Sequence, residues 1–200
     1  MPVATPSDLR AWLRIPAADW SADDDAAAAL LLELAQGVIE EEAGQTLDSS
    51  EDTVILDGPT HNDGQHHAAA GSVRLVLPRW PVTAVDSVEL LNRDGSVSST
   101  LMHGADYTWS QAGILTRIGG CWPTGDQVVR LTYTAGFATW PAGLRRIALR
   151  LAAQAWTNPA NLTQEVLGDH SRSFAAESLG MELSQTDRRV ISAYRARTTS

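Results

Sequence analysis

The chain has 200 residues with 15 basic and 24 acidic side chains, a net charge of −9, and every basic residue is arginine. Such an acidic chain does not suit a broad phosphate-binding face for duplex DNA or a polybasic membrane patch. A single cysteine excludes an internal disulfide framework, and the longest apolar run, residues 26–32, is far too short to cross a membrane. With 44% hydrophobic residues and seven Trp, the chain can still build a core.

The N-terminal segment, residues 1–52, predicts two helices. A short helix is expected over residues 8–13, before Pro16. Ser21 has the position of an N-cap and Gly44 that of a C′ residue, which bounds a longer helix. Its apolar residues recur at three- and four-residue spacing and are expected to form one core-facing stripe: Ala27, Leu30, Leu31, Leu34, Val38 and Ile39.

The middle segment, residues 53–140, changes to the two-residue period of strands. Short strands are expected over the following ranges: 53–56, 73–77, 85–91, 106–110, 114–118 and 127–134. Tight turns at 92–95 and 111–113 make the sheet antiparallel. In the clearest strand, Val129, Leu131 and Tyr133 are expected on one face.

The C-terminal segment, residues 141–200, returns to helix. Pro141 suits the first helical position, and the helix that follows should end at Asn158-Pro159. Residues 159–182 lack a steady period and read as a long loop, and Ser184 with Asp187 resembles a capping box before a final short helix. The fold class is therefore α+β: amphipathic helices in a small bundle with an inserted antiparallel β-region, in a single domain spanning 1–200.

Charge is unevenly distributed along the chain. Residues 1–52 hold two Arg and twelve acids, a net charge of −10. Residues 53–140 carry −2 and residues 141–200 carry +3. The chain is thus electrically polarised from end to end.

One loop contains side chains that could bind a metal: His61, Asp63, His66 and His67. No helix fixes their geometry, so an exposed loop without a ligand role is the preferred interpretation, and we expect no metal, cofactor or catalytic residue. A small metal-dependent enzyme remains the alternative, and metal analysis with a His66→Ala control separates the two.

Two stretches resemble a known family. Residues 76–88 read VLPRWPVTAVDSV, and residues 129–137 read VRLTYTAGF before Trp140-Pro141 and an Ala-rich helix. This order resembles the head–tail connector (head-to-tail adaptor) family of long-tailed bacteriophages, including those of actinobacterial hosts. Residues 167–174 and 190–195 resemble the loop and the C-terminal end of the same proteins.

The resemblance implies a structural virion protein, made in the host cytoplasm and located at the neck. About twelve copies would form a ring under the portal protein, extend the DNA channel and offer a docking surface to the stopper, the next neck protein. DNA would pass through the lumen without specific binding, and no membrane is involved. A different neck or tail component, such as a stopper or tail terminator, is the other alternative.

The resemblance also suggests roles for the charged ends. Family members engage the portal through their C-terminal segment, which makes these residues docking candidates: Val190, Ile191, Tyr194, Arg195 and Arg197. An acidic lumen repels the duplex and lets it slide, so we expect lumen- or rim-facing residues among the acids of the long helix: Asp23, Asp24, Asp25, Glu33, Glu40, Glu41 and Glu42. The alternative is that both charge groups serve only solubility.

Overall fold

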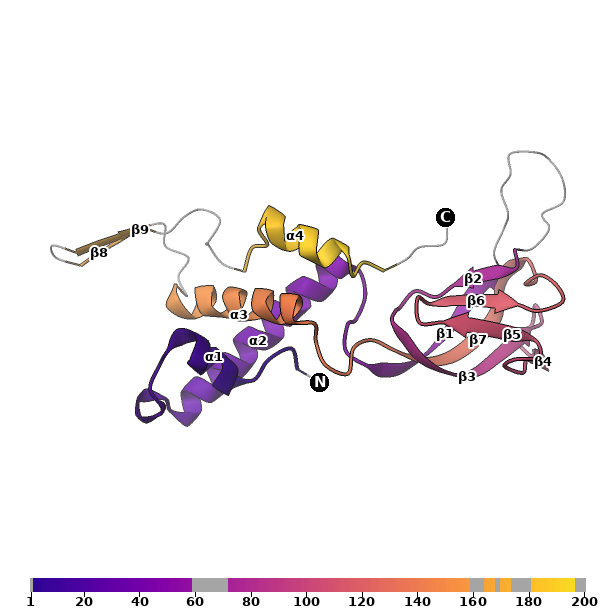
Figure 1. Ribbon diagram of the computed structural model, residues 1–200, viewed down its shortest axis with the longest axis horizontal. Coiled ribbons are helices and arrows are strands. Elements are labelled where there is room, and N and C mark those ends of the chain that lie inside the picture. The colour runs from indigo at the N-terminus through magenta and orange to yellow at the C-terminus, as the bar shows by residue number, and fades with distance from the viewer. Residues whose placement is uncertain (1, 59–71, 159–163, 168–169, 174–180, 197–200) are drawn as a thin grey trace. The chain divides into compact units, whose positions relative to one another are not determined.

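The computed structural model describes residues 2–58, 72–158, 164–167, 170–173 and 181–196. The chain divides into two compact units (Figure 1). The helical unit comprises Met1–Gln45 and Thr139–Arg195, and the β unit comprises Thr46–Ala138. The β unit is thus inserted between two helical segments, and the expected α+β class with an antiparallel β-region is confirmed.

The long N-terminal helix begins after its predicted N-cap, Ser21, whereas the short helix before it begins at Pro6, two residues earlier than expected. Helix α1 spans Pro6–Leu13, and α2 spans Ala22–Ala43 after a 3₁₀ turn at Ala17–Asp19. Ser21 caps α2 in a capping box with Asp24, and Gly44 ends the helix in the left-handed conformation.

The core-facing side of α2 differs from the expected stripe. The buried residues are Ala28, Leu32, Ala35, Ile39 and Ala43. Leu30 and Leu34, expected in the core, are 56% and 50% exposed. Apolar residues surround most of this helix, so periodicity did not single out one face, and packing against the neighbouring helices selected the side rich in small residues.

The other two helices complete the unit. Helix α3 spans Ala142–Thr157, with Pro141 as its N-cap, and α4 spans Gln185–Ser192, with the expected capping box between Ser184 and Asp187. Both α1 and α3 contact α2, and α4 contacts α2 and α3. The ring of Trp156 stacks on that of Trp20, with centroids 4.9 Å apart.

The β unit consists of two antiparallel sheets. The four-stranded sheet has the order β1-β7-β3-β4, formed by Ser50–Gly58, Gly125–Ala135, Val82–Leu91 and Val97–Thr100. The three-stranded sheet has the order β2-β6-β5, formed by Arg74–Val76, Ile114–Arg117 and Tyr107–Ser110. Strand β4 was not expected, because its four residues are all exposed and show no alternation.

One core joins the two sheets. Alternate residues of β7 point into it, and Val129, Leu131 and Tyr133 share that face as predicted. Leu75 and Leu115 enter it from the smaller sheet, and the buried Trp122 completes it. This arrangement leaves the opposite faces of both sheets for polar residues.

Arg79 binds the start of β1 and the end of β7, which are paired with each other. Its side chain is only 11% exposed. Its guanidinium donates to the carbonyl oxygens of Asp48 and Ala135, at 2.8 and 3.3 Å, and to the Ser50 hydroxyl at 3.0 Å. A planar group with several donors is suited to satisfying such converging backbone acceptors.

A separate two-stranded hairpin lies in the stretch expected to be a loop. Strands β8, Gln164–Leu167, and β9, His170–Ser173, pair antiparallel. Short polar strands show too little periodicity for sequence patterning to find them. Across the described residues, no helix combines the length and the hydropathy needed to cross a bilayer.

Candidate functional site

The loop with the possible metal ligands, His61, Asp63, His66 and His67, lies outside the described residues. Within the described part of the chain, no three His, Cys, Asp or Glu side chains gather as a metal site would require. The predicted site residues that the structure does describe all lie on the helical unit.

Four of the seven candidate lumen acids are engaged within the helical unit. Asp24 accepts hydrogen bonds from the backbone N–H and the hydroxyl of Ser21, at 2.8 and 2.7 Å, which lower the pKa of its carboxyl group. Asp25 accepts the Trp20 indole N–H at 2.7 Å, and Glu40 accepts from the Gln36 amide at 3.4 Å.

Glu42 is the most strongly engaged acid of the four. Its side chain is 11% exposed and forms ion pairs with Arg188, at 2.6 Å, and with Arg195. These contacts join the end of α2 to α4 and the residues after it. Glu42 therefore holds the helical unit together in this structure.

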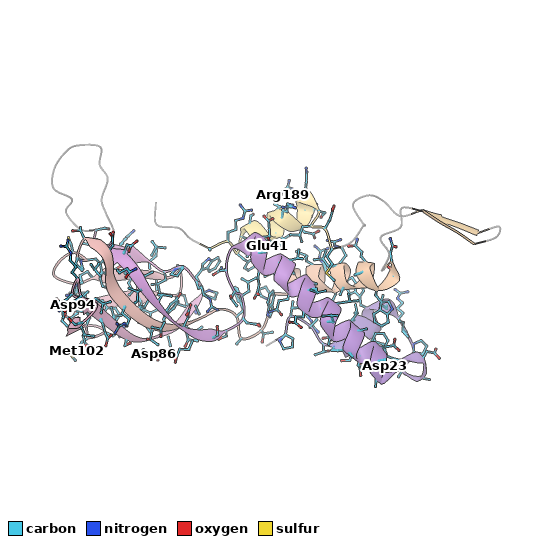
Figure 2. The ribbon with its side chains drawn as sticks, turned by 180° about the vertical axis from the view of Figure 1, so that it is seen from behind. Asp23, Glu41, Asp86, Asp94, Met102 and Arg189 are labelled. Carbon is cyan, nitrogen blue, oxygen red and sulfur yellow. The ribbon has the colours of Figure 1, made fainter. Side chains whose placement is uncertain are left out.

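The side chains of the remaining candidates, Asp23, Glu33 and Glu41, are exposed and have no hydrogen-bond or ion-pair partner among the described residues. Asp23 and Glu41 lie near opposite ends of α2 (Figure 2). At 100° per residue, they occupy the same side of the helix, and Glu33 lies about 80° to one side of them. In the predicted set of seven acids, only these three have side chains that no described residue binds.

An exposed stripe connects Asp23 to Glu41 along α2. Every residue on this line is exposed: Asp23, Ala27, Leu30, Leu34, Gly37 and Glu41. The stripe lies opposite the core-facing residues Leu32 and Ile39. It is thus acidic at both ends and apolar in the middle. The sequence pattern did not reveal this surface, because the same leucines were expected in the core.

The portal-docking candidates divide according to burial. Ile191 is completely buried, so its side chain is not available to a partner in this structure. Val190 packs beside Gly143 of α3, and the backbone carbonyl of Tyr194 accepts the Gln45 amide at 2.6 Å. Arg195 pairs with Glu42, and Arg197 lies outside the described residues.

A buried ion pair fixes α4 against α3. Arg150 donates to Asp187 at 2.6 Å, and the Asp187 side chain is 5% exposed. The same carboxylate accepts the backbone N–H of Ser184 at 3.0 Å. Asp187 therefore both caps α4 and docks it, a role that its sequence position predicted only in part.

Several arginines of the helical unit have no acidic partner among the described residues: Arg10, Arg14, Arg146 and Arg189. Arg146 is on α3 and Arg189 is on α4, where both are exposed (Figure 2 labels Arg189). The unit thus carries unpaired positive charge on helices other than α2.

The comparisons with known proteins concern the fold. No family model matches the chain, and no curated protein matches it. A solved chain from the neck of an empty gene transfer agent (GTA) particle, computed with C6 symmetry, has a TM-score of 0.60 at 21% identity, and the match covers 98% of this chain and 91% of that one. This chain has the fold of that neck component.

Two further solved structures are similar. A chain of the virion of a native GTA particle has a TM-score of 0.59 at 22% identity, over 98% of this chain and 91% of that one. A chain from the neck of a native GTA particle computed with C12 symmetry has a TM-score of 0.54 at 21% identity, over 96% and 88%. The shared fold therefore spans both the helical unit and the β unit.

Proposed function

We propose that this chain is a structural neck protein of a phage-like virion, and that it acts as a head-to-tail adaptor. The observation that carries the proposal is the fold shared with a GTA neck chain over 98% of this chain and 91% of that chain. Because function belongs to surfaces and not to a fold alone, the proposal also draws on the charges and exposed residues of the helical unit.

A ring of about twelve copies under the portal is the expected assembly. The similar neck structures were computed with C6 and C12 symmetry, which supports a closed cyclic arrangement. Such a ring would extend the DNA channel and give the stopper a surface to bind.

Free carboxylates on α2 supply the charge that a DNA channel needs. Asp23, Glu33 and Glu41 have exposed side chains without a cationic partner among the described residues. Repulsion between carboxylates and phosphates lets the duplex slide without being held. We propose that acids of this set face the lumen or its rim.

The C-terminal segment is the proposed portal-docking element. Arg188 and Arg195 are more than half exposed although both pair with Glu42. Their exposed guanidinium faces offer positive charge to an acidic portal surface. Val190 and Tyr194, each half-buried, would contribute their exposed edges.

The test is to mix the purified protein with the portal of its own phage and to image the product by electron microscopy. A ring stacked on the tail-facing side of the portal is the expected result. Absence of any association with the portal would overturn the adaptor role. Binding only to a preassembled portal–adaptor complex from the same phage would instead identify a stopper.

A further inference from the structure

The exposed stripe of α2 presents apolar side chains that are not covered by the part of the chain that the structure describes. Leu30 and Leu34, 56% and 50% exposed, occupy adjacent turns, and Ala27 and Gly37 extend the apolar part on either side. A helix that is apolar on both sides is normally buried on both sides. Contiguous exposed apolar residues with a polar rim commonly mark a protein–protein contact.

We propose that this stripe packs against a second copy of the same chain, as the subunit contact of the ring. The inference rests on the proposed function, and it specifies the surface that closes the ring. Leu30 and Leu34 would be the central anchors, and Asp23 and Glu41 would lie at the rim, the usual anatomy of an interface.

Charge complementarity identifies a second copy as the occupant. The stripe ends in two carboxylates without a cationic partner among the described residues. The same unit carries Arg146 and Arg189 on other helices, exposed and likewise without an acid there. Each copy thus offers an acidic surface and a basic surface, and a neighbour can satisfy both.

The two surfaces also suit the geometry of a ring. A closed ring joins two different patches of each protomer, head to tail. If the stripe instead packed on itself around a twofold axis with antiparallel helices, Asp23 would approach the partner's Glu41 and like charges would repel. The head-to-tail contact avoids that cost and brings arginines to the carboxylates.

One consequence concerns the channel. With Asp23 and Glu41 at the rim of the subunit contact, Glu33 lies to one side of the stripe with a free carboxylate. Glu33 is then the acid of the set best placed to face DNA.

Photo-crosslinking from the stripe tests the occupant directly. The variant Cys121→Ser/Ala27→Cys is labelled with benzophenone maleimide, assembled on the portal and irradiated. Ala27 lies on the stripe beside the anchors, and both replaced side chains are exposed, so the protomer should fold normally. The control carries the label at Met102→Cys, a 69% exposed position of the β unit.

The expected product is a ladder of covalently linked copies of this chain, with the crosslinked peptide mapping to the helical unit of the neighbour. A crosslink to the portal, a crosslink within one copy, or no crosslink in an assembled ring would each overturn the inference. All three outcomes are scored on assembled rings, so each of them leaves the adaptor role standing. If the unmodified protein forms no ring, the proposed function fails together with the inference.

Substitution of the anchors gives an independent readout. Leu30→Gln/Leu34→Gln should keep the circular dichroism spectrum and melting temperature of the protomer and reduce the yield of rings at least tenfold, because two large apolar groups are lost from the contact. The matched control Val97→Gln/Met102→Gln should assemble normally. Normal assembly of the leucine variant would contradict the proposal.

A charge swap locates the basic half of the contact. Glu41→Arg should reduce ring formation, and Arg189→Glu or Arg146→Glu in the same chain should restore it, because each copy then offers reversed charges on both surfaces. Assembly unaffected by Glu41→Arg would show that this carboxylate is not at the contact.

Discussion

Gly136, within the TYTAGF stretch, occupies a position that no other residue fits. Its φ of +108° is unfavourable for side chains with a Cβ, and a Cβ there would lie 2.3 Å from the carbonyl oxygen of Asp48. The chain passes this close because the ends of β1 and β7 converge where Arg79 binds. The close approach of the Asp48 backbone therefore explains why this position of the motif is a glycine.

We predict that Gly136→Ala destabilises the β unit by about 2–4 kcal/mol, from the combined cost of strain and steric overlap. The matched control is Gly95→Ala, where φ is +81° but nothing lies within 4 Å of the added Cβ. That substitution should cost about 1 kcal/mol. Urea denaturation of both variants measures the difference, and equal costs would show that the Asp48 contact is not responsible.

Tyr133 gives the β unit a dependence on alkaline pH. Burial, and secondarily the Asp52 carboxylate, raise the pKa of its phenol to about 12. The folded state therefore keeps the proton after the unfolded state has lost it. The contribution of Tyr133 to the unfolding free energy, about 2–3 kcal/mol, is fully present below pH 10 and is lost as the pH rises through 12.

Tyr133→Phe should remove this component, so its unfolding free energy should decline less between pH 10 and 12 than that of the unchanged protein. Near neutral pH the variant should be about as stable or slightly more so, since a buried hydroxyl is lost and the ring remains. Chemical denaturation across this range provides the measurement. An unchanged pH dependence would mean that the phenol ionises equally well in the folded state.

Helices α2 and α4 both begin with a serine capping box but differ in what the capping acid binds. Asp24 of α2 and Asp187 of α4 both occupy the third helical position after a serine N-cap. Asp24 serves only the cap, whereas Asp187 is buried and also binds Arg150. The local sequence is similar, and the tertiary environment makes the difference.

Asp187→Asn should therefore destabilise the helical unit by about 2 kcal/mol or more, because Arg150 loses its partner in a partly buried site. Asp24→Asn, the matched control, should have a clearly smaller effect. Thermal unfolding followed at 222 nm compares them, and hydrogen exchange in α4 should rise only for Asp187→Asn. Equal losses of stability in the two variants would show that Asp187 acts only as a capping residue.

At the level of elements, the sequence pattern located the ends of the helices more accurately than the sides that they bury. Caps and turn residues are local signals, so Ser21, Gly44 and Ser184 marked the helix ends correctly. Strand β7 was also found, because it alternates over most of its length. Strand β4 and the β8–β9 hairpin were missed, since short polar strands depend on pairing with a neighbour and not on their own composition.

For the whole molecule, the distribution of charge leads to a prediction about salt. If the positive C-terminal segment docks on an acidic portal surface, binding should weaken as ionic strength rises from 0.1 to 1 M. The reason is that the Debye screening length falls from about 10 to about 3 Å over this range. Titration of the protein onto isolated portal at several salt concentrations measures this. Affinity independent of salt would indicate an apolar docking surface instead.

The proposed channel lining leads to a second prediction at this scale. Glu33→Arg should leave ring assembly intact but slow the exit of DNA from assembled particles by several-fold, because a ring of guanidinium groups would attract phosphates. Glu33→Gln should have little effect. Ejection of DNA from particles carrying each variant is the measurement, and an unchanged rate with Glu33→Arg would place this residue outside the channel.

The sequence by itself determined the α+β class, the order of helices and most strands, and the polarity of charge along the chain, because periodicity, capping and composition are properties of neighbouring residues. Only the tertiary structure decided which side of α2 is buried, that Glu42 is paired with Arg188 and Arg195, and that Ile191 belongs to the core. The ion pairs of Glu42 join side chains 146 and 153 positions apart, and α2 packs on helices from both ends of the chain. When a helix is apolar on two sides, its own sequence does not show which side the rest of the chain will bury. In this protein the exposed side of α2 is the one available to a neighbouring copy.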